Sequence, residues 1–511
     1  MISLLLIEII LLNKNTYLPV KNLTKSKKKL LLTLGGRQTF FRNQKTWTSK
    51  YMTQQKDELL KRIQKLVKQN QDLIDKNEKL QRAVDELSAE IESLKKNGGG
   101  VVRSEDSEGD KIIVQKFKMA TVLFANIDGF YKLTDDIDSE ALMDQLDEVL
   151  IQFNCILKKY KIQKIKTIGD TYMAAGGIPL KNITNPVQVV MAALEMQLFL
   201  REKSGAEGER IWNMSLGIHT GPVTANISGK KKVSYDIKGD TVNIAHRVQG
   251  VGESGKILIS VMTYELVKEF FVCDYYGKLP VKYKGDLEMF EVIGIRPEFS
   301  VKGEGILPND LFDTKFKLIQ FTDLQELILD KLEKELPSYL YYHNVKHTVD
   351  VVTEVELIGW AEGLEDADIL ILKTAGLFHD AGHTIGYDDH EYYGTQIVKE
   401  MLPKYGYTEK EIERVCEVIM ATKMPPQPKD LLQKIICDAD LDYLGRSDMI
   451  PVSNTLYKEL KEQNKIGTLN DWNKLQVKFI SGHQYFTKTA QTLREVNKQK
   501  QIERIRELIE E

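Results

Sequence analysis

Leucine recurs at every seventh position near the start of the chain. The positions are Leu59, Leu66, Leu73, Leu80, Leu87 and Leu94. With these leucines at d, the a positions are Ile63, Asn70, Asn77, Val84 and Ile91. Leucine at d with β-branched residues at a favours two parallel helices, and asparagines at a fix their register. We therefore predict a parallel dimeric coiled coil over residues 52–97; the alternative is one amphipathic helix that packs on its own domain.

Residues 113–297 alternate the hydrophobic patterns of strands and helices. The apolar run at 119–125 is typical of a buried strand, and 139–160 has the period of an amphipathic helix. Two short runs around Gly169 and Asp170 predict a β-hairpin. A helix at about 186–203 and a strand at 212–221 follow. This order predicts an α+β domain whose antiparallel sheet is covered by helices on one side.

After residue 297 the pattern becomes helical. Several glycines and two prolines in residues 296–310 predict a linker, and residues 312–495 predict an all-α domain. A charged helix is predicted from about Phe486, and its alternating charges, which continue through the C-terminal residues 496–511, predict a solvated face. Residues 1–51 have no sustained period, so we expect a poorly ordered extension, with the true start at Met1 or Met52.

Composition adds limits to this picture. A chain of 511 residues is too long for one hydrophobic core, which agrees with several domains. The net charge of −3 gives no reason to expect nucleic acid or a membrane surface as a partner. The apolar stretch at the start is shorter than the roughly twenty residues that span a bilayer. Four scattered cysteines without a CxxC pair favour a reducing compartment, so we expect a cytoplasmic protein.

Five motifs lie in the segment with mixed patterns. They are FANIDGF, KTIGDTYMAAGG, GIHTGPV, YDIKGDTVNIAHR and VKYKGD. In order and spacing they resemble the catalytic domain of class III adenylyl and guanylyl cyclases, over residues 115–295. The resemblance implies a ferredoxin-like α+β fold and a homodimer whose active sites take residues from both subunits. It also implies that Mg²⁺ or Mn²⁺ ions orient the ribose 3′-oxygen toward the α-phosphate of a nucleoside triphosphate.

The resemblance also implies roles for single residues. Asp170 matches one metal aspartate, while Asn126 stands where the family has the other. An amide oxygen brings no negative charge, so metal affinity should fall; Asp128 shares the strand face of Asn126 and is expected to compensate in part. Lys166 and Asp236 match the pair that recognises adenine, which favours ATP over GTP. The alternative is that this pair is a structural salt bridge without selectivity.

Three further residues match the phosphate and ribose contacts of these cyclases. Asn243 and Arg247 lie four positions apart and therefore share a helix face. By the resemblance, Asn243 positions the ribose and Arg247 stabilises charge on the reacting phosphate. Lys282 matches the lysine that neutralises the terminal phosphate.

Histidines cluster in the helical segment. Of eight in the chain, five lie close together: His343, His347, His379, His383 and His390. The motifs YHNVKHTVDV, LFHDAGH and CDADLDYLGR resemble the HD superfamily of metal-dependent phosphohydrolases, over residues 312–495. The implied metal ligands are His347, His379, Asp380 and Asp440, with Asp438 as the alternative to Asp440. Such a mixed set suits Zn, Fe, Mn or Mg.

The first two of these motifs are similar to those of cyclic-nucleotide phosphodiesterases. That similarity implies that His343 is the general acid, that metal-activated water attacks phosphorus, and that His383 and His390 hold a second metal. Our leading hypothesis is a bifunctional enzyme that forms cyclic AMP from ATP and hydrolyses a phosphoester. The alternative is a nucleotide-sensing pseudocyclase that regulates an active hydrolase, and a third hypothesis is a dimeric scaffold without turnover.

Overall fold

The computed structural model describes residues 113–128, 139–168, 171–206, 213–228, 234–281 and 285–510. The predicted coiled coil at 52–97 and the extension at 1–51 lie outside the described residues. Asp170 and Lys282 also lie outside them.

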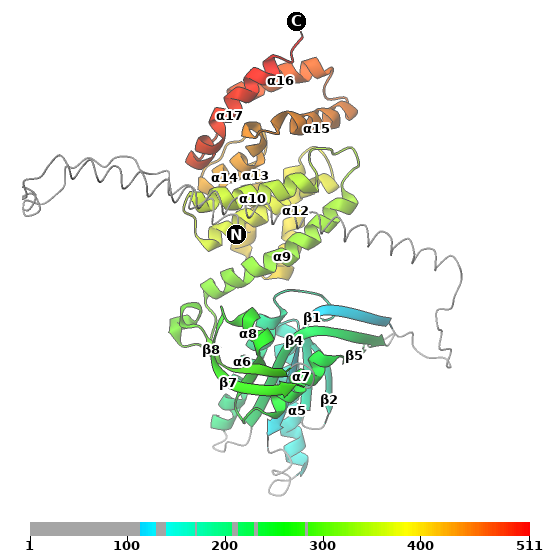
Figure 1. Cartoon of the computed structure of the whole chain (residues 1–511), viewed down its shortest axis with the longest axis vertical. Helices are drawn as coiled ribbons and strands as arrows, with labels where there is room; N and C mark the ends of the chain where they lie inside the picture. The colour runs from blue at the N-terminus through cyan, green and yellow to red at the C-terminus, as the bar shows by residue number, and fades with distance from the viewer. Residues whose placement is uncertain are drawn as a thin grey trace, which may run out of the picture. The chain divides into compact units, whose positions relative to one another are not determined.

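Within the described residues, eight strands form one sheet (Figure 1). Their order is β2-β3-β1-β4-β6-β8-β7, with β5 paired to β4. All neighbours are antiparallel except β4 and β6. The strands are β1 (Ile113–Asp128), β2 (Gln163–Ile168), β3 (Thr171–Gly176), β4 (Asn213–Ser228), β5 (Ser234–Lys238), β6 (Ile257–Ser260), β7 (Phe271–Val281) and β8 (Gly285–Ile295).

Helices cover both faces of this sheet. They are α5 (Ser139–Lys159), α6 (Asn185–Ala206), α7 (Asp240–Gly250) and α8 (Val261–Val267). Alternate side chains of a strand point to opposite faces. Accordingly, Leu123 and Ala125 of β1 share a core with α5, α6 and α8, whereas Val122 and Phe124 share one with Ala245 of α7. The α+β domain is confirmed, but the prediction of helices on one side only is wrong for α7.

The position of α7 depends on Gly217 of β4. A Cβ atom at this glycine would lie 2.1 Å from the backbone nitrogen of Gln249 in α7, far closer than atoms can approach. Only glycine lets the helix pack this tightly on the strand. Gln249 also donates a hydrogen bond to Ser215 Oγ, at 2.9 Å. The exposed side of α7 is therefore fixed relative to the sheet.

From residue 310 the described chain is helical, which confirms the all-α prediction (Figure 1). The helices are α9 (Asp310–Glu335), α10 (Val345–Ala361), α11 (Asp366–Phe378), α12 (His390–Met401), α13 (Glu409–Met420), α14 (Leu431–Asp440), α15 (Met449–Glu462), α16 (Leu469–Gly482) and α17 (Lys488–Arg506). The described chain also contains five short 3₁₀ helices: η1 (Pro297–Phe299) and η2 (Val301–Gly303) precede α9, and η3 (Ala381–Thr384), η4 (Leu402–Tyr405) and η5 (Asp442–Gly445) lie between later helices. The predicted linker at 296–310 thus contains η1 and η2 and ends where α9 begins.

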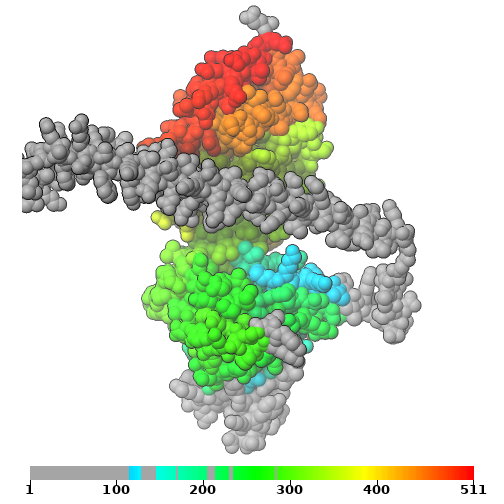
Figure 2. Space-filling model, in the orientation of Figure 1, coloured from blue at the N-terminus to red at the C-terminus, as the bar shows by residue number. Residues whose placement is uncertain are grey.

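The last helix begins close to its predicted start but differs from its prediction in burial. Helix α17 begins at Lys488, and it packs beside α15 and α16 (Figure 2, orange to red). Ile502 and Ile505 are 4% and 2% exposed, so one side of the helix is buried rather than solvated. The high charge content of this segment concealed its apolar positions. No helix in the described part of the chain is both long and apolar enough to cross a membrane.

Candidate functional site

Side chains from three helices meet in the helical region. His347 lies in the first turn of α10, which Asn344 caps by accepting hydrogen bonds from two backbone amides. His379 follows α11, and Asp440 ends α14. His347 Nε2 lies 3.3 Å from His379 Nε2 and 3.1 Å from Asp440 Oδ1. The ligand atoms of these three residues all lie within 4.8 Å of one another, which one cation can span.

Hydrogen bonding fixes which nitrogen of His379 faces this group. His379 Nδ1 lies 2.9 Å from the carbonyl oxygen of Gly376. Because a carbonyl only accepts, Nδ1 carries a proton, and Nε2 is the nitrogen directed at the group. A backbone carbonyl orients many metal-binding histidines in this way.

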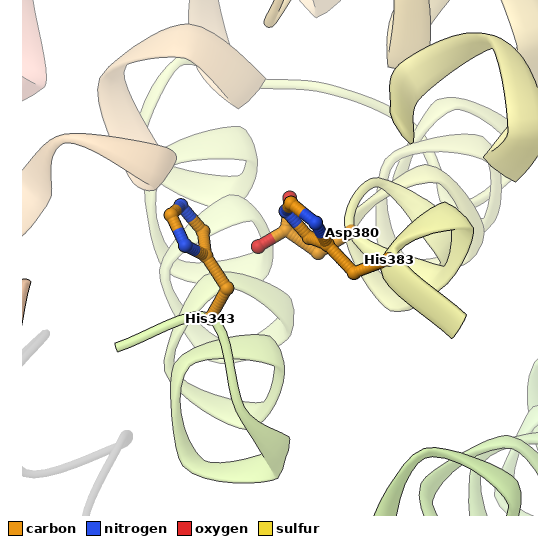
Figure 3. A group of neighbouring side chains, drawn as sticks. All are labelled: His343, Asp380 and His383. Atoms are coloured by element: carbon orange, nitrogen blue, oxygen red, sulfur yellow. The ribbon is translucent and has the colours of Figure 1, made fainter. Parts of the chain in front are cut away.

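Asp380 lies between this group and a second one. Its Oδ2 is 3.3 Å from His379 Nε2 and 3.5 Å from His347 Nε2. The second group is His343, Asp380 and His383, and Figure 3 shows the Asp380 carboxylate directed toward His343. The Asp380 carboxylate therefore belongs to the second group and lies beside two histidines of the first.

His383 has two ring nitrogens without a partner. The residue is 2% exposed, and within the described chain neither nitrogen makes a hydrogen bond. Its ring stacks on that of His390, with centroids 4.0 Å apart. Burial lowers the pKa of His383 to about 3, so the imidazole is neutral and keeps a lone pair. A buried, unpartnered imidazole beside a carboxylate fits a ligand of a second cation.

The aspartates remain ionised despite their burial. Burial alone would raise the pKa of Asp380, but His379 and His343 lower it well below its usual value. Burial also opposes the shift of Asp440, whose pKa His347 and His379 lower. Buried carboxylates require positive charge beside them. The imidazoles and carboxylates of this site therefore fit a divalent cation such as Zn, Fe, Mn or Mg.

The structure separates Asp440 from its sequence alternative, Asp438. The Asp438 carboxylate accepts hydrogen bonds from the backbone of Phe486 at 2.8 Å and from the backbone and hydroxyl of Thr487, both at 2.7 Å. Asp438 thus holds the start of α17, whereas Asp440 points to the histidines.

A cavity of about 270 Å³ opens beside this site. His347 and Asp440 form one part of its wall, and Lys346, Arg446 and Tyr443 form another. The Arg446 guanidinium pairs with Asp448 at 2.6 Å and with Asp350 at 3.0 Å. A small molecule beside His347 would therefore meet both aromatic and charged walls.

The sheet brings other predicted residues together. Asn126 of β1 lies opposite Thr171 of β3, and its Nδ2 donates to Thr171 Oγ1 at 3.3 Å. Thr171 follows Asp170 in the sequence. The side chain of Asp128 lies outside the described part of the structure.

Lys166 of β2 and Asp236 of β5 lie side by side. The Lys166 Nζ is 3.5 Å from Asp236 Oδ1, and the two side chains are 44% and 47% exposed. Lys238 lies 3.5 Å from the other carboxylate oxygen. These long, exposed ion pairs are weak, so both groups remain able to turn toward a ligand.

Asn243 and Arg247 are exposed on α7. The Arg247 guanidinium donates a hydrogen bond to the carbonyl of Pro280 in β7. Lys282, two residues further along, is outside the described residues.

The sheet and the helical site both match known families. Residues 112–294 match the adenylate and guanylate cyclase catalytic domain, and residues 344–442 match the HD domain. The chain carries a class III cyclase catalytic domain and an HD domain.

The relatives of the cyclase domain include proteins named as guanylate cyclases and proteins named as adenylate cyclases. It is 31% identical over 190 residues to guanylate cyclase 32E of Drosophila melanogaster, covering 36% of this chain and 16% of that protein. It is also 31% identical over 183 residues to an adenylate cyclase of Mycobacterium tuberculosis, covering 36% of this chain and 41% of that protein. The match thus spans less than half of either relative. Among solved structures, the adenylyl cyclase CyaB from P. aeruginosa is 29% identical, covering 38% of this chain and 100% of that chain, with a TM-score of 0.34.

Sequence reasoning missed one residue beside the HD domain site. Glu459 of α15 has a fully buried side chain, and its carboxylate lies 2.5 Å from His343 Nδ1. It also accepts hydrogen bonds from the backbone of Tyr342 and His343 at 3.0 and 3.2 Å and from the Tyr387 hydroxyl at 3.2 Å. Glu459 lies beyond the matched range, in a helix whose sequence carries no motif, so no local signal marks it.

Proposed function

We propose that the cyclase domain converts ATP to cyclic AMP and pyrophosphate. The observation that carries this proposal is the exposed Lys166–Asp236 pair, whose charged groups are 3.5 Å apart. An ammonium group donates and a carboxylate accepts, which suits the ring-nitrogen acceptor and the amino donor of adenine. Guanine presents the reverse pattern at these positions. Both a guanylate cyclase and an adenylate cyclase match this domain, so similarity alone does not favour ATP or GTP. The proposal of ATP therefore depends on the Lys166–Asp236 pair.

The proposed active site needs two chains. Each site takes Asn126 and Asp170 from one subunit and Asn243, Arg247 and Lys282 from the other. The exposure of Asn243 and Arg247 on α7 supports this arrangement, because a second chain has access to both side chains. The predicted coiled coil at 52–97 would supply the parallel dimer.

The chain's own residues divide the work of cyclisation. Mg²⁺ or Mn²⁺ would lower the charge barrier between the ribose oxygen and the phosphate. Asn243 positions the ribose, Arg247 stabilises the charge that develops on the α-phosphate, and Lys282 neutralises the terminal phosphate. Asn126 offers an oxygen without a charge, so we expect the cation to bind more weakly than it would with aspartate there.

The alternative is a nucleotide-sensing pseudocyclase that regulates the HD domain. Asn126 favours it, because its amide already donates to Thr171 and adds no charge to the site. Replacement of Asn126 by Asp distinguishes the two: a large rise in cyclic AMP output supports the pseudocyclase, and an already high wild-type rate removes it.

We further propose that the HD domain hydrolyses a phosphoester, with cyclic AMP as the first substrate to test. A divalent cation held by His347, His379, Asp380 and Asp440 would polarise the phosphoryl oxygen and lower the pKa of water. Burial would lower the pKa of His343, but the paired Glu459 and nearby Asp380 raise it. The raised pKa favours the protonated form of His343, which can give its proton to the leaving oxygen.

Product analysis of the purified full-length chain tests both halves. The protein is incubated with ATP or GTP and with Mg²⁺ or Mn²⁺, and cyclic nucleotides and monophosphates are separated by chromatography. Arg247→Ala should abolish cyclic AMP formation, whereas His379→Ala should abolish only the hydrolysis of added cyclic AMP. A wild-type chain that forms no cyclic nucleotide, or that is monomeric with and without ATP, contradicts the first proposal. If cyclic AMP is not hydrolysed, cyclic AMP is not the substrate of the HD domain. If no phosphodiester is hydrolysed, the proposal that the HD domain is a hydrolase is contradicted.

A further inference from the structure

Helix α9 belongs to two hydrophobic cores. Phe312 in its first turn is 4% exposed and packs on Phe270 and Phe271 of the cyclase domain, with ring centroids 5.0 and 6.2 Å apart. Further along the same helix, Phe321 and Leu324 are buried in the core of the helical domain. A molecule that binds against α9 therefore contacts an element shared by both cores.

A cavity of about 640 Å³ lies beside the first half of α9. Its walls come from α5 and the residues just after it, α6, β8, the loop at 305–308, α9 and residues 405–406. The lining residues include Tyr160, Leu194, Ile293, Leu307, Phe316 and Gln320. Sites that bind small organic ligands have volumes of about 300–1,000 Å³, so this cavity is large enough for one.

Large apolar side chains line the cavity and are left exposed at it. Ile293, Ile306 and Leu307 are 53%, 49% and 58% exposed. Phe312 and Phe316 stand behind them in α9. Exposed apolar groups that gather at one cavity, rather than singly over a surface, are typical of a binding site.

Gln320 adds a specific polar requirement. It is 8% exposed, and within the described chain its Oε1 is buried without a hydrogen-bond partner. A buried carbonyl oxygen without a partner is costly to the fold. Gln320 also lines the cavity, so a turn of its amide toward the cavity would let Oε1 accept a hydrogen bond from an N–H or O–H group of a bound molecule and would remove that cost.

The charges around the cavity do not call for a charged ligand. Glu195 Oε2 accepts hydrogen bonds from both Lys159 and Tyr160, at 2.7 Å each, so these charges already offset one another. Burial raises the pKa of Asp313, although Lys317 opposes that shift, which indicates an environment unfavourable to charge. A neutral molecule enters such a site with the smaller loss of hydration.

We propose that this cavity binds a neutral, mainly apolar small molecule that donates one hydrogen bond to Gln320 Oε1. The ligand contacts the helix common to the two cores and so stabilises both domains. The proposal stands apart from the activities proposed above, because it concerns binding only.

The fluorescent probe 1-N-phenylnaphthylamine tests the site, since it is neutral, apolar and carries one N–H. Titrated into the full-length chain, it should bind saturably at one site per chain. Ile293→Trp, which fills the cavity mouth, should weaken binding by about tenfold or more. Leu266→Trp is the matched control, because Leu266 is 44% exposed on α8 and lies away from the cavity. Binding that does not saturate, or that Ile293→Trp leaves unchanged, overturns the proposal.

A second pair of ligands isolates the hydrogen bond. In 1-phenoxynaphthalene an ether oxygen replaces the N–H at almost unchanged shape. Measured by displacement, it should bind the wild-type chain about tenfold more weakly than the amine, the effect of one neutral hydrogen bond. Gln320→Leu should remove this difference while the ether still binds. Equal affinities of the two ligands for the wild-type chain contradict the role given to Gln320.

Discussion

Replacement of Gly217 by alanine tests how strictly the cyclase site depends on the position of α7. The new Cβ would lie 2.1 Å from the backbone nitrogen of Gln249 and 2.4 Å from its Cα. An ordinary contact begins near 3.4 Å, so α7 must move by about 1.3 Å. The obstacle is helix backbone rather than a flexible side chain, so no rotamer change relieves it.

That movement displaces Asn243 and Arg247 together. A misplacement of about 1 Å in a catalytic arrangement can cost roughly 10²-fold in rate. We therefore expect Gly217→Ala to reduce cyclic AMP formation from ATP by about two orders of magnitude, measured as initial rate with saturating Mn²⁺. Hydrolysis by the HD domain in the same preparation should be unchanged, since Gly217 lies in the sheet.

Gly250→Ala is the matched control. Gly250 ends the same helix, and a Cβ there meets nothing within 4 Å. The variant should keep the wild-type rate of cyclic AMP formation. If Gly217→Ala also keeps the wild-type rate, while remaining folded and dimeric, then α7 does not set the geometry of the reaction and our reasoning is refuted.

Four further outcomes are expected. Asn126→Asp should lower the Mg²⁺ concentration needed for half-maximal cyclic AMP formation, without a large rise in the rate at saturating Mg²⁺, because it adds a negative charge to the proposed metal position; an unchanged apparent metal affinity contradicts this. Glu459→Gln should lower the rate of phosphodiester hydrolysis by about 10²-fold or more. It should also move the alkaline limb of the pH profile of hydrolysis to lower pH, because Glu459 raises the pKa of His343. If the alkaline limb does not shift, Glu459 has a structural role only. Chelation of divalent cations should lower the melting temperature of the wild-type chain and should affect His379→Ala much less; equal shifts locate the bound cation elsewhere. Burial and Asp442 raise the pKa of Glu354 to about 7, so its contribution to stability is present at low pH and is lost as pH rises from about 4.5 to 7. Glu354→Gln should therefore lose less stability than the wild-type chain over that window, by at most about 3 kcal/mol, in thermal unfolding.

The arrangement of elements was predictable where its cause is local. The apolar run in β1 and the helical spacing after residue 310 depend on neighbours in sequence, and both predictions are confirmed. The side of the sheet that α7 covers was not predictable, because it depends on the close approach of Gln249 to Gly217.

The same distinction applies to the candidate metal site. The adjacent His379 and Asp380 mark it in sequence, and the structure brings them to His347. The choice between Asp438 and Asp440 needed the fold, because residues two apart in a helix point in different directions. The partner of His343 in α15 is 116 residues away in sequence, so no local pattern could indicate it.

Helix α9 packs in the cores of both domains, and this limits where recombination during evolution can separate them. If a gene fusion separated the two domains within the linker, ahead of residue 310, the cyclase domain would lose Phe312. Its residues Phe270 and Phe271 would then face a cavity where Phe312 packs in this chain. Recombination that transplants the cyclase intact must carry the opening turns of the following helix with it. The structural boundary between the two domains therefore lies inside α9, after its first two turns, and not in the linker that precedes this helix.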